Sequence, residues 1–92
     1  MAKTDFQNEV VNRVRKLRTE KAVSQVGLAK LIDVGNGQIG NIESPKFPHK
    51  YTIKQLYVIA RCFNVSIGYL FTGNNDTLTV ENLIEILIKY DG

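Results

Sequence analysis

The segment from Ser24 to Glu43 constrains the fold of this chain more than any other. It holds two short stretches with apolar residues at helical spacing, and the triplet Asp33-Val34-Gly35 separates them. A small residue, Ala29, lies in the first stretch, where it would let two helix backbones approach closely while larger side chains fill the space around it. The pattern predicts two short helices that cross over a tight turn.

The size and composition of the chain favour one small domain. Its 92 residues, 43% of them hydrophobic, are enough for a single core, and a helical domain of this size can fold without disulfides or metals. The only cysteine, Cys62, can form no disulfide within the chain. No apolar run approaches the roughly 20 residues of a membrane span, and the first residues lack the apolar region of a secretory signal. We therefore expect a cytoplasmic protein with no membrane segment.

Charged residues are distributed unevenly along the chain. Residues 1–61 contain eleven of the twelve lysines and arginines but only five of the nine acidic residues. Residues 62–92 contain one lysine, Lys89, and four acidic residues. A basic front and an acidic rear suit a protein that meets a polyanion with one end.

The sequence offers little that could support catalysis. His49 is the only histidine, no Cys/His spacing suits a metal, and the common glycine-rich phosphate-binding motifs are missing. The cluster Gly35-Asn36-Gly37 lacks the preceding strand of a dinucleotide-binding loop. We expect a protein that is not an enzyme and that uses no metal, no cofactor and no small-molecule effector.

Helical periodicity and capping residues predict five or six helices and no strand. The expected helices cover about 7–21, a second helix capped by Ser24, about 36–43, a fourth opened by the capping box Thr52-Ile53-Lys54-Gln55, a fifth from Ser66 to Phe71, and about 80–90. Asn64 is expected to end the fourth helix in a left-handed conformation. The chain thus divides into a flexible tail over 1–8, a helical domain over 9–72, and a linker with a C-terminal helix over 73–92.

Between about residues 10 and 71, the chain resembles the Cro/lambda-repressor-like family of helix-turn-helix proteins, also called the XRE family. The matching residues are Leu17-Arg18, Ser24-Gln25, Leu28-Ala29, Val34 at the turn, Ile39, Ile42-Glu43 and the run from Leu56 to Leu70. The resemblance implies an all-α fold, a five-helix lambda-repressor-like domain, which a C-terminal amphipathic helix follows here. It also implies a DNA-binding transcriptional regulator whose second motif helix enters the major groove.

The resemblance further implies two sets of DNA contacts. Its base-contacting positions are occupied by Asn36, Gly37 and Asn41, with Gln38 close by, and amide side chains pair well with adenine. Its phosphate-contacting positions are occupied by Gln25 at the start of the second helix and, in the loop after the third, by Lys46, His49 and Lys50, with Lys30 as a further candidate. Simpler interpretations stay open, because asparagine is a common cap and turn residue and loop lysines are often merely solvated.

Three features depart from the family pattern. Gly37 and Gly40 in the expected third helix would together cost about 2 kcal/mol of helix stability. No arginine or lysine lies between Val34 and Glu43, which removes the commonest contact to guanine. Asp33 stands where the family usually has glycine, although aspartate tolerates a left-handed backbone better than most residues. These features indicate either few direct base contacts with more reliance on DNA shape, or a helix that has lost base reading.

Arg18 and Glu43 match family positions that often form an ion pair between the first helix and the end of the third. The planar guanidinium of arginine suits a partly buried carboxylate. We expect this pair to fix the third helix relative to the first, with two independent surface charges as the alternative.

The C-terminal helix carries an apolar stripe that needs a covering. Its residues are Leu83, Ile84, Leu87 and Ile88, and we expect them to form a dimer surface together with Ile67, Tyr69 and Val58. A two-fold dimer would place two recognition helices about 34 Å apart on a palindromic site. The alternative is that this helix covers the core of its own monomer.

The sequence thus predicts a homodimeric transcriptional regulator, of the repressor type, that binds double-stranded DNA at a palindromic operator. The alternative is a protein-interaction module, such as an antitoxin whose acidic C-terminal end neutralises a basic toxin.

Overall fold

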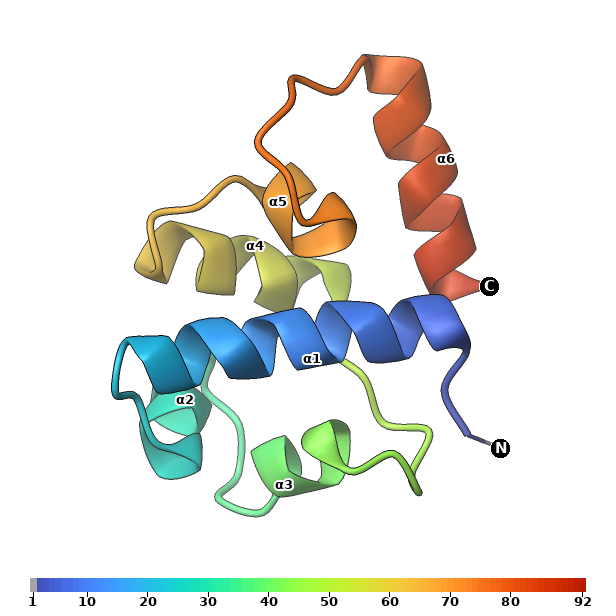
Figure 1. The fold of residues 1–92 in the computed structure, drawn as a ribbon. Coiled ribbons are helices and arrows are strands. Elements are labelled where there is room, and N and C mark those ends of the chain that lie inside the picture. The colour runs from blue at the N-terminus through green and yellow to red at the C-terminus, as the bar shows by residue number, and fades with distance from the viewer. Residues whose placement is uncertain (1) are drawn as a thin grey trace.

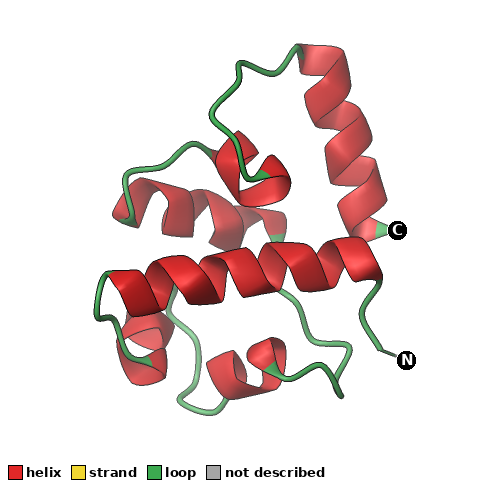
Figure 2. Cartoon of the chain, in the orientation of Figure 1, coloured by secondary structure: helices red, strands yellow, loops and turns green. Residues whose placement is uncertain are grey.

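The computed structural model describes residues 2–92 and is all helical over that range (Figure 2). This confirms the predicted fold class. The helices are α1 (Asp5–Glu20), α2 (Gln25–Leu31), α3 (Gln38–Glu43), α4 (Ile53–Cys62), α5 (Ile67–Thr72) and α6 (Val80–Asp91). None of them is long and apolar enough to span a membrane.

Helix α1 is the centre of the fold. In Figure 1 it runs across the molecule with α2 and α3 below it, α4 and α5 above it, and α6 at the end where both termini lie. The core consists of apolar side chains from all six helices and the α3–α4 loop: Val10, Val11, Val14, Leu17, Leu28, Ala29, Ile32, Ile39, Ile42, Tyr51, Leu56, Ile59, Ala60, Phe63, Leu70, Phe71 and Tyr90. Helix α1 packs on α3, α5 and α6, and α2 packs on both α3 and α4, so all the helices share one core.

Hydroxyl side chains begin five of the helices. Thr4, Ser24, Thr52, Ser66 and Thr79 each accept a hydrogen bond from a backbone N–H in the first turn of the following helix. The predicted capping box at Thr52 is confirmed, because Gln55 bonds back to the Thr52 N–H at 2.9 Å.

Three helices end in the same left-handed turn. After α1, α2 and α4 come Ala22, Asp33 and Asn64, with φ of 56°, 58° and 56°. In each case the next residue is a valine whose N–H bonds back five residues to a helix carbonyl, at 2.9–3.0 Å, and whose side chain packs on the core. This is the Schellman motif, and it sets the direction in which the chain leaves each helix.

The flexible tail predicted over 1–8 is wrong for residues 3–8. Helix α1 begins at Asp5, because Thr4 and Gln7 form a second capping box. Lys3, only 6% exposed, donates from Nζ to the carbonyls of Ser44, Phe47 and His49 at 2.9, 2.7 and 3.0 Å. The chain before α1 is thereby attached to the loop between α3 and α4.

Candidate nucleic-acid interface

Helix α3 is shorter than the sequence predicted. It begins at Gln38, with Gly37 as its N-cap, so the expected start at Asn36 is wrong. Gly37 has no side chain to cap the helix, its carbonyl accepts the first helical bond from the Asn41 N–H at 3.2 Å, and the Gln38 N–H donates to the Gly35 carbonyl at 3.1 Å. Asn36 and Gly37 therefore lie in the turn between α2 and α3. Only Gly40 weakens the helix itself, so the expected loss of about 2 kcal/mol falls to about 1 kcal/mol.

The two faces of α3 differ sharply. Ile39 and Ile42 are buried against the core, and Glu43 is only 8% exposed. Gln38 and Asn41 lie on the exposed face, as do Asn36 and Gly37 in the turn. The surface that α3 presents is thus made of amides and backbone, with no charged side chain.

A buried ion pair fixes α3 to α1. Arg18 donates from Nε to Oε2 of Glu43 and from Nη2 to Oε1, both at 2.9 Å, so the pair expected between these residues is present and bidentate. The third guanidinium nitrogen, Nη1, donates to the Val23 carbonyl at 2.9 Å. Planar, bidentate geometry of this kind, with each of the three guanidinium nitrogens donating one bond, makes a charge pair strong and directional. Arg18 therefore holds the end of α3 and the start of the α1–α2 connection in one arrangement.

Gln25 joins the same cluster. Its Nε2 donates to Oε1 of Glu43 at 2.9 Å, so one amide N–H of the predicted phosphate contact is already used inside the protein. Arg15 lies at the rim, with Nε 3.9 Å from the same oxygen and a side chain 60% exposed. The sequence reasoning missed Arg15, although its position three residues before Arg18 places it on the same side of α1.

A shallow groove brings most of the remaining candidates together. Gln38 and Asn41 line it from α3, His49 and Lys50 from the following loop, and Gln55 from α4. Residues predicted to meet bases thus share one concave surface with residues predicted to meet phosphates. Lys46 is exposed in the same loop, whereas Lys30 is exposed on α2 and lines no part of this groove.

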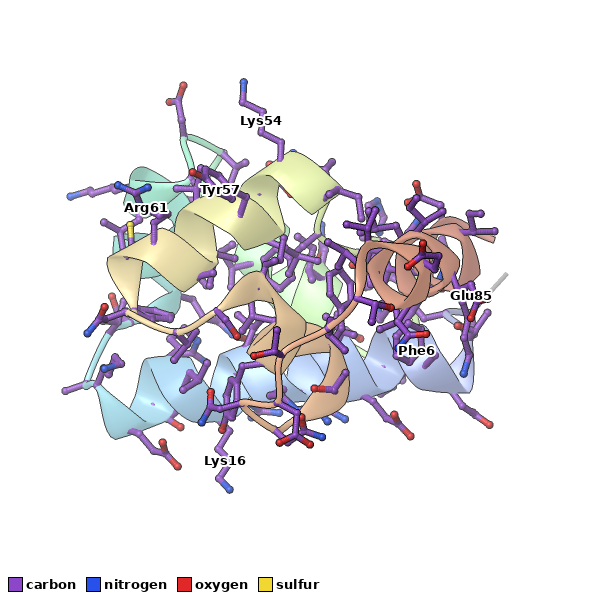
Figure 3. All side chains as sticks on the ribbon, turned by 90° about the horizontal axis from the view of Figure 1, so that it is seen from above. Phe6, Lys16, Lys54, Tyr57, Arg61 and Glu85 are labelled. Atoms are coloured by element: carbon purple, nitrogen blue, oxygen red, sulfur yellow. The ribbon has the colours of Figure 1, made fainter. Side chains whose placement is uncertain are left out.

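Helix α6 is attached to the domain by its C-terminal end. The Tyr90 side chain is fully buried between Phe6 and Phe71, and its hydroxyl donates to the Tyr51 carbonyl at 2.7 Å. Gln7 donates from Nε2 to the Tyr90 carbonyl at 2.6 Å. Burial raises the pKa of the Tyr90 hydroxyl well above its usual value, so it stays protonated as a donor. Figure 3 shows Phe6 beneath α6 at this end of the molecule.

The predicted dimer stripe is divided between two environments. Leu83 and Leu87 are half-buried, as is Ile86, which the prediction left off the stripe. Ile84 and Ile88 remain 50% and 67% exposed, and Val80 beside them is 70% exposed. Ile67, Tyr69 and Val58, expected to face outward, are half-buried against the core. Docking of Tyr90 sets this orientation, so α6 covers its own monomer with one face and leaves the line Val80, Ile84, Ile88 uncovered.

Known proteins share this sequence pattern and this arrangement. A family model described as a helix-turn-helix domain matches residues 11–76. The HTH-type transcriptional regulator PrpR of Mycobacterium tuberculosis is 30% identical over 74 residues, which are 80% of this chain and 15% of PrpR. RamB, an HTH-type transcriptional regulator of the same species, is 32% identical over 82 residues, which are 89% of this chain and 17% of RamB. The chain therefore spans less than a fifth of either relative.

A solved structure shows the same fold. The crystal structure of the hypothetical transcription factor NHTF from Neisseria superposes with a TM-score of 0.62 at 16% identity, covering 89% of this chain and 85% of that one. Together with the family match over residues 11–76, this confirms the helix-turn-helix resemblance. The chain belongs to the helix-turn-helix domain family.

Proposed function

We propose that this protein is a sequence-specific DNA-binding transcriptional regulator that presents α3 to the major groove. The observation that carries the proposal is the exposed amide surface of α3, which a buried bidentate ion pair holds rigidly against α1. A reading surface must be held to within about 0.5 Å of its productive position, and such a pair supplies that constraint. The names of PrpR and RamB, both transcriptional regulators, support the same conclusion.

In this proposal, amide side chains contact the bases. Asn41 and Gln38 are exposed on α3, and Asn36 precedes the helix. Each amide can donate to N7 and accept from N6 of adenine in the bidentate manner, so half-sites rich in A·T pairs are expected. Gly37 adds no side chain, and it would allow the backbone before α3 to lie close to the base edges.

In this proposal, residues of the α3–α4 loop and of α2 bind the phosphates on either side of α3. Lys46, His49 and Lys50 follow α3 in the chain, and Lys30 is exposed near the end of α2. The Gln25 amide is shared with Glu43, so the N–H groups in the first turn of α2 would meet a phosphate together with the remaining amide hydrogen. Arg15 is a further cation near this edge.

A second copy of the chain is the proposed partner of α6. Val80, Ile84 and Ile88 form one exposed apolar line, and Glu81, Glu85 and Lys89 form the adjacent row at the same four-residue spacing. When two α6 helices pack antiparallel, Glu81 of each copy comes near Lys89 of the other at the ends of the interface, and this pair would replace the contact of Lys89 Nζ with the Phe6 ring, 4.7 Å from its centroid. Such a two-fold dimer, acting as a repressor, would bind a palindromic operator with half-sites about 34 Å apart.

Selection from a pool of random duplexes at near-physiological salt tests base reading. We expect the wild type to enrich a two-fold-symmetric motif, and Asn36→Ala/Asn41→Ala to lose it, since each bidentate amide contact contributes about 1–3 kcal/mol of discrimination. If the wild type enriches no motif, α3 is not a base reader. The uncovered α6 line beside acidic residues would then favour a protein partner, as in the antitoxin alternative.

Sedimentation at high micromolar concentration tests the dimer separately. We expect the wild type to sediment as a dimer and Ile84→Glu to sediment as a folded monomer. A wild type that stays monomeric at this concentration would contradict the dimer while leaving base reading open to the selection experiment.

A further inference from the structure

The Lys3 ammonium lies at the centre of a hydrogen-bond cluster that has no part in the proposed base contacts of α3. Its three N–H donors meet three carbonyl oxygens, those of Ser44, Phe47 and His49, at 2.7–3.0 Å. An ammonium has three donors and no acceptor, so every hydrogen-bonding group of this side chain is used. The side chain is nearly buried, and burial lowers the pKa of Lys3.

The three carbonyls describe the path of the α3–α4 loop. Ser44 is the C-cap residue of α3, where the helix dipole also favours a cation, and Phe47 and His49 flank the second proline of the loop. The loop has few bonds of its own, because within 45–50 only the Lys46 and Phe47 N–H groups bond back to Ser44, at 3.3 and 3.5 Å. Lys3 thus supplies most of the hydrogen bonds that fix its shape.

We infer that Lys3 is a positioning residue for phosphate binding: it holds the α3–α4 loop so that Lys46, His49 and Lys50 reach the DNA backbone while α3 lies in the groove. The inference rests on the proposed function. Lys3 itself touches no phosphate, since its ammonium is enclosed by protein carbonyls. Lysine, unlike the planar fork of arginine, can direct three donors from a single nitrogen, so Lys3→Arg cannot reproduce the cluster.

Lys3→Met keeps the length of the side chain and removes the ammonium. The matched control is Lys16→Met, which removes one positive charge from an exposed residue of α1 that lies beside Tyr69 and Thr72 of α5 and lines no part of the groove next to α3. Amide hydrogen exchange on the protein without DNA should accelerate at Lys46 and Phe47, whose N–H groups bond to Ser44, in Lys3→Met and stay unchanged in Lys16→Met. Unchanged exchange in Lys3→Met would overturn the inference.

Binding to the selected duplex, measured across salt concentrations, provides the functional readout. We expect Lys3→Met to bind at least about tenfold more weakly, with a salt slope shallower by about one unit for each phosphate that the loop no longer neutralises. Lys16→Met should keep the slope of the wild type. If Lys3→Met does not fold, Lys3→Arg is measured in its place, and we expect the same direction with a smaller decrease in affinity.

The two failures are distinguishable. If the wild type binds the duplex and Lys3→Met matches it in affinity and slope, only the role of Lys3 is refuted. If the wild type binds no duplex, the proposed function fails, and this role of Lys3 fails with it.

Discussion

Helices α3 and α6 are the two elements proposed to meet partners, and they are held in opposite ways. Helix α3 has six residues, and hydrogen bonds that converge on Glu43 and on the Ser44 carbonyl fix its C-terminal end. Helix α6 has twelve residues, docks mainly through Tyr90, and leaves Val80, Ile84 and Ile88 exposed. A polar surface that must match base edges needs precise positioning, whereas an apolar surface needs only to be covered. The difference shows that short length is no obstacle to rigidity when charge-assisted bonds hold the helix.

Arg18→Ala should have the largest effect on stability, because it leaves the Glu43 carboxylate buried without its cation. We expect a decrease of about 3–5 kcal/mol in the free energy of unfolding, measured with urea. The control is Arg15→Ala, an exposed neighbour of the same carboxylate, which should cost at most about 1 kcal/mol. Equal decreases for the two variants would show that the α3 attachment is not specific to Arg18.

Tyr90→Phe tests the attachment of α6 with a smaller change. It removes the hydroxyl donor of the buried Tyr51 carbonyl, and we expect the free energy of unfolding to fall by about 1–3 kcal/mol. The matched control is Tyr51→Phe, since the Tyr51 hydroxyl is buried and has no hydrogen-bond partner among residues 2–92. That variant should be neutral or slightly stabilising. A larger decrease for Tyr51→Phe than for Tyr90→Phe in urea unfolding would contradict the proposed attachment.

Gly40→Ala should stabilise α3 by up to about 1 kcal/mol, since alanine is the better helix former. A Cβ at this position would lie 3.5 Å from Oε1 of Gln25, an ordinary contact. Gly73→Ala, in contrast, should destabilise the protein. Gly73 has a φ of 80°, and a Cβ there would lie 3.1 Å from Nε of Arg13. Thermal melting of both variants checks the opposite signs, and two shifts of the same sign would show that one of the two expectations is wrong.

Ile88→Ser should have the smallest effect on the stability of the monomer. Ile88 is 67% exposed, and substitutions at such positions usually change stability by less than about 0.5 kcal/mol. Self-association should nevertheless weaken, because the apolar line loses one of its three members. A marked drop in melting temperature at low micromolar concentration, where the monomer prevails, would show that this face is covered within the monomer.

Local signals explain what the sequence could predict. The Ser24, Thr52 and Ser66 caps predict three helix starts that the structure shows, and Asp33 and Asn64 adopt the expected left-handed turns because these residue types tolerate them. Ala22 adopts the same conformation with no such signal, since alanine has no special preference for it. The predicted start of α3 differs from the observed start at Gln38, because no capping side chain in Gly35-Asn36-Gly37 marks where the helix begins.

Long-range contacts explain what the sequence could not predict. The bonds of Lys3 and of Tyr90 join residues 39–83 positions apart, and no local periodicity encodes such pairings. The bonds of Lys3 attach the N-terminal segment to the fold, and the bonds of Tyr90 determine which face of α6 packs inward. The pairing of Arg18 with Glu43, 25 positions apart, was reached through family resemblance and not through pattern.

The attachment of α6 near its C-terminal end, centred on Tyr90, has a kinetic consequence. Residues 73–77 before α6 are all exposed, so the helix can detach as a unit when Tyr90, Ile86 and Leu87 leave the core together. Detachment exposes Phe6 and Phe71, and the last turn of α6 loses its support. A second copy that binds the docked α6 suppresses this opening by mass action. A longer lifetime of the dimer should therefore accompany a lower exchange rate of the most protected amides in α6.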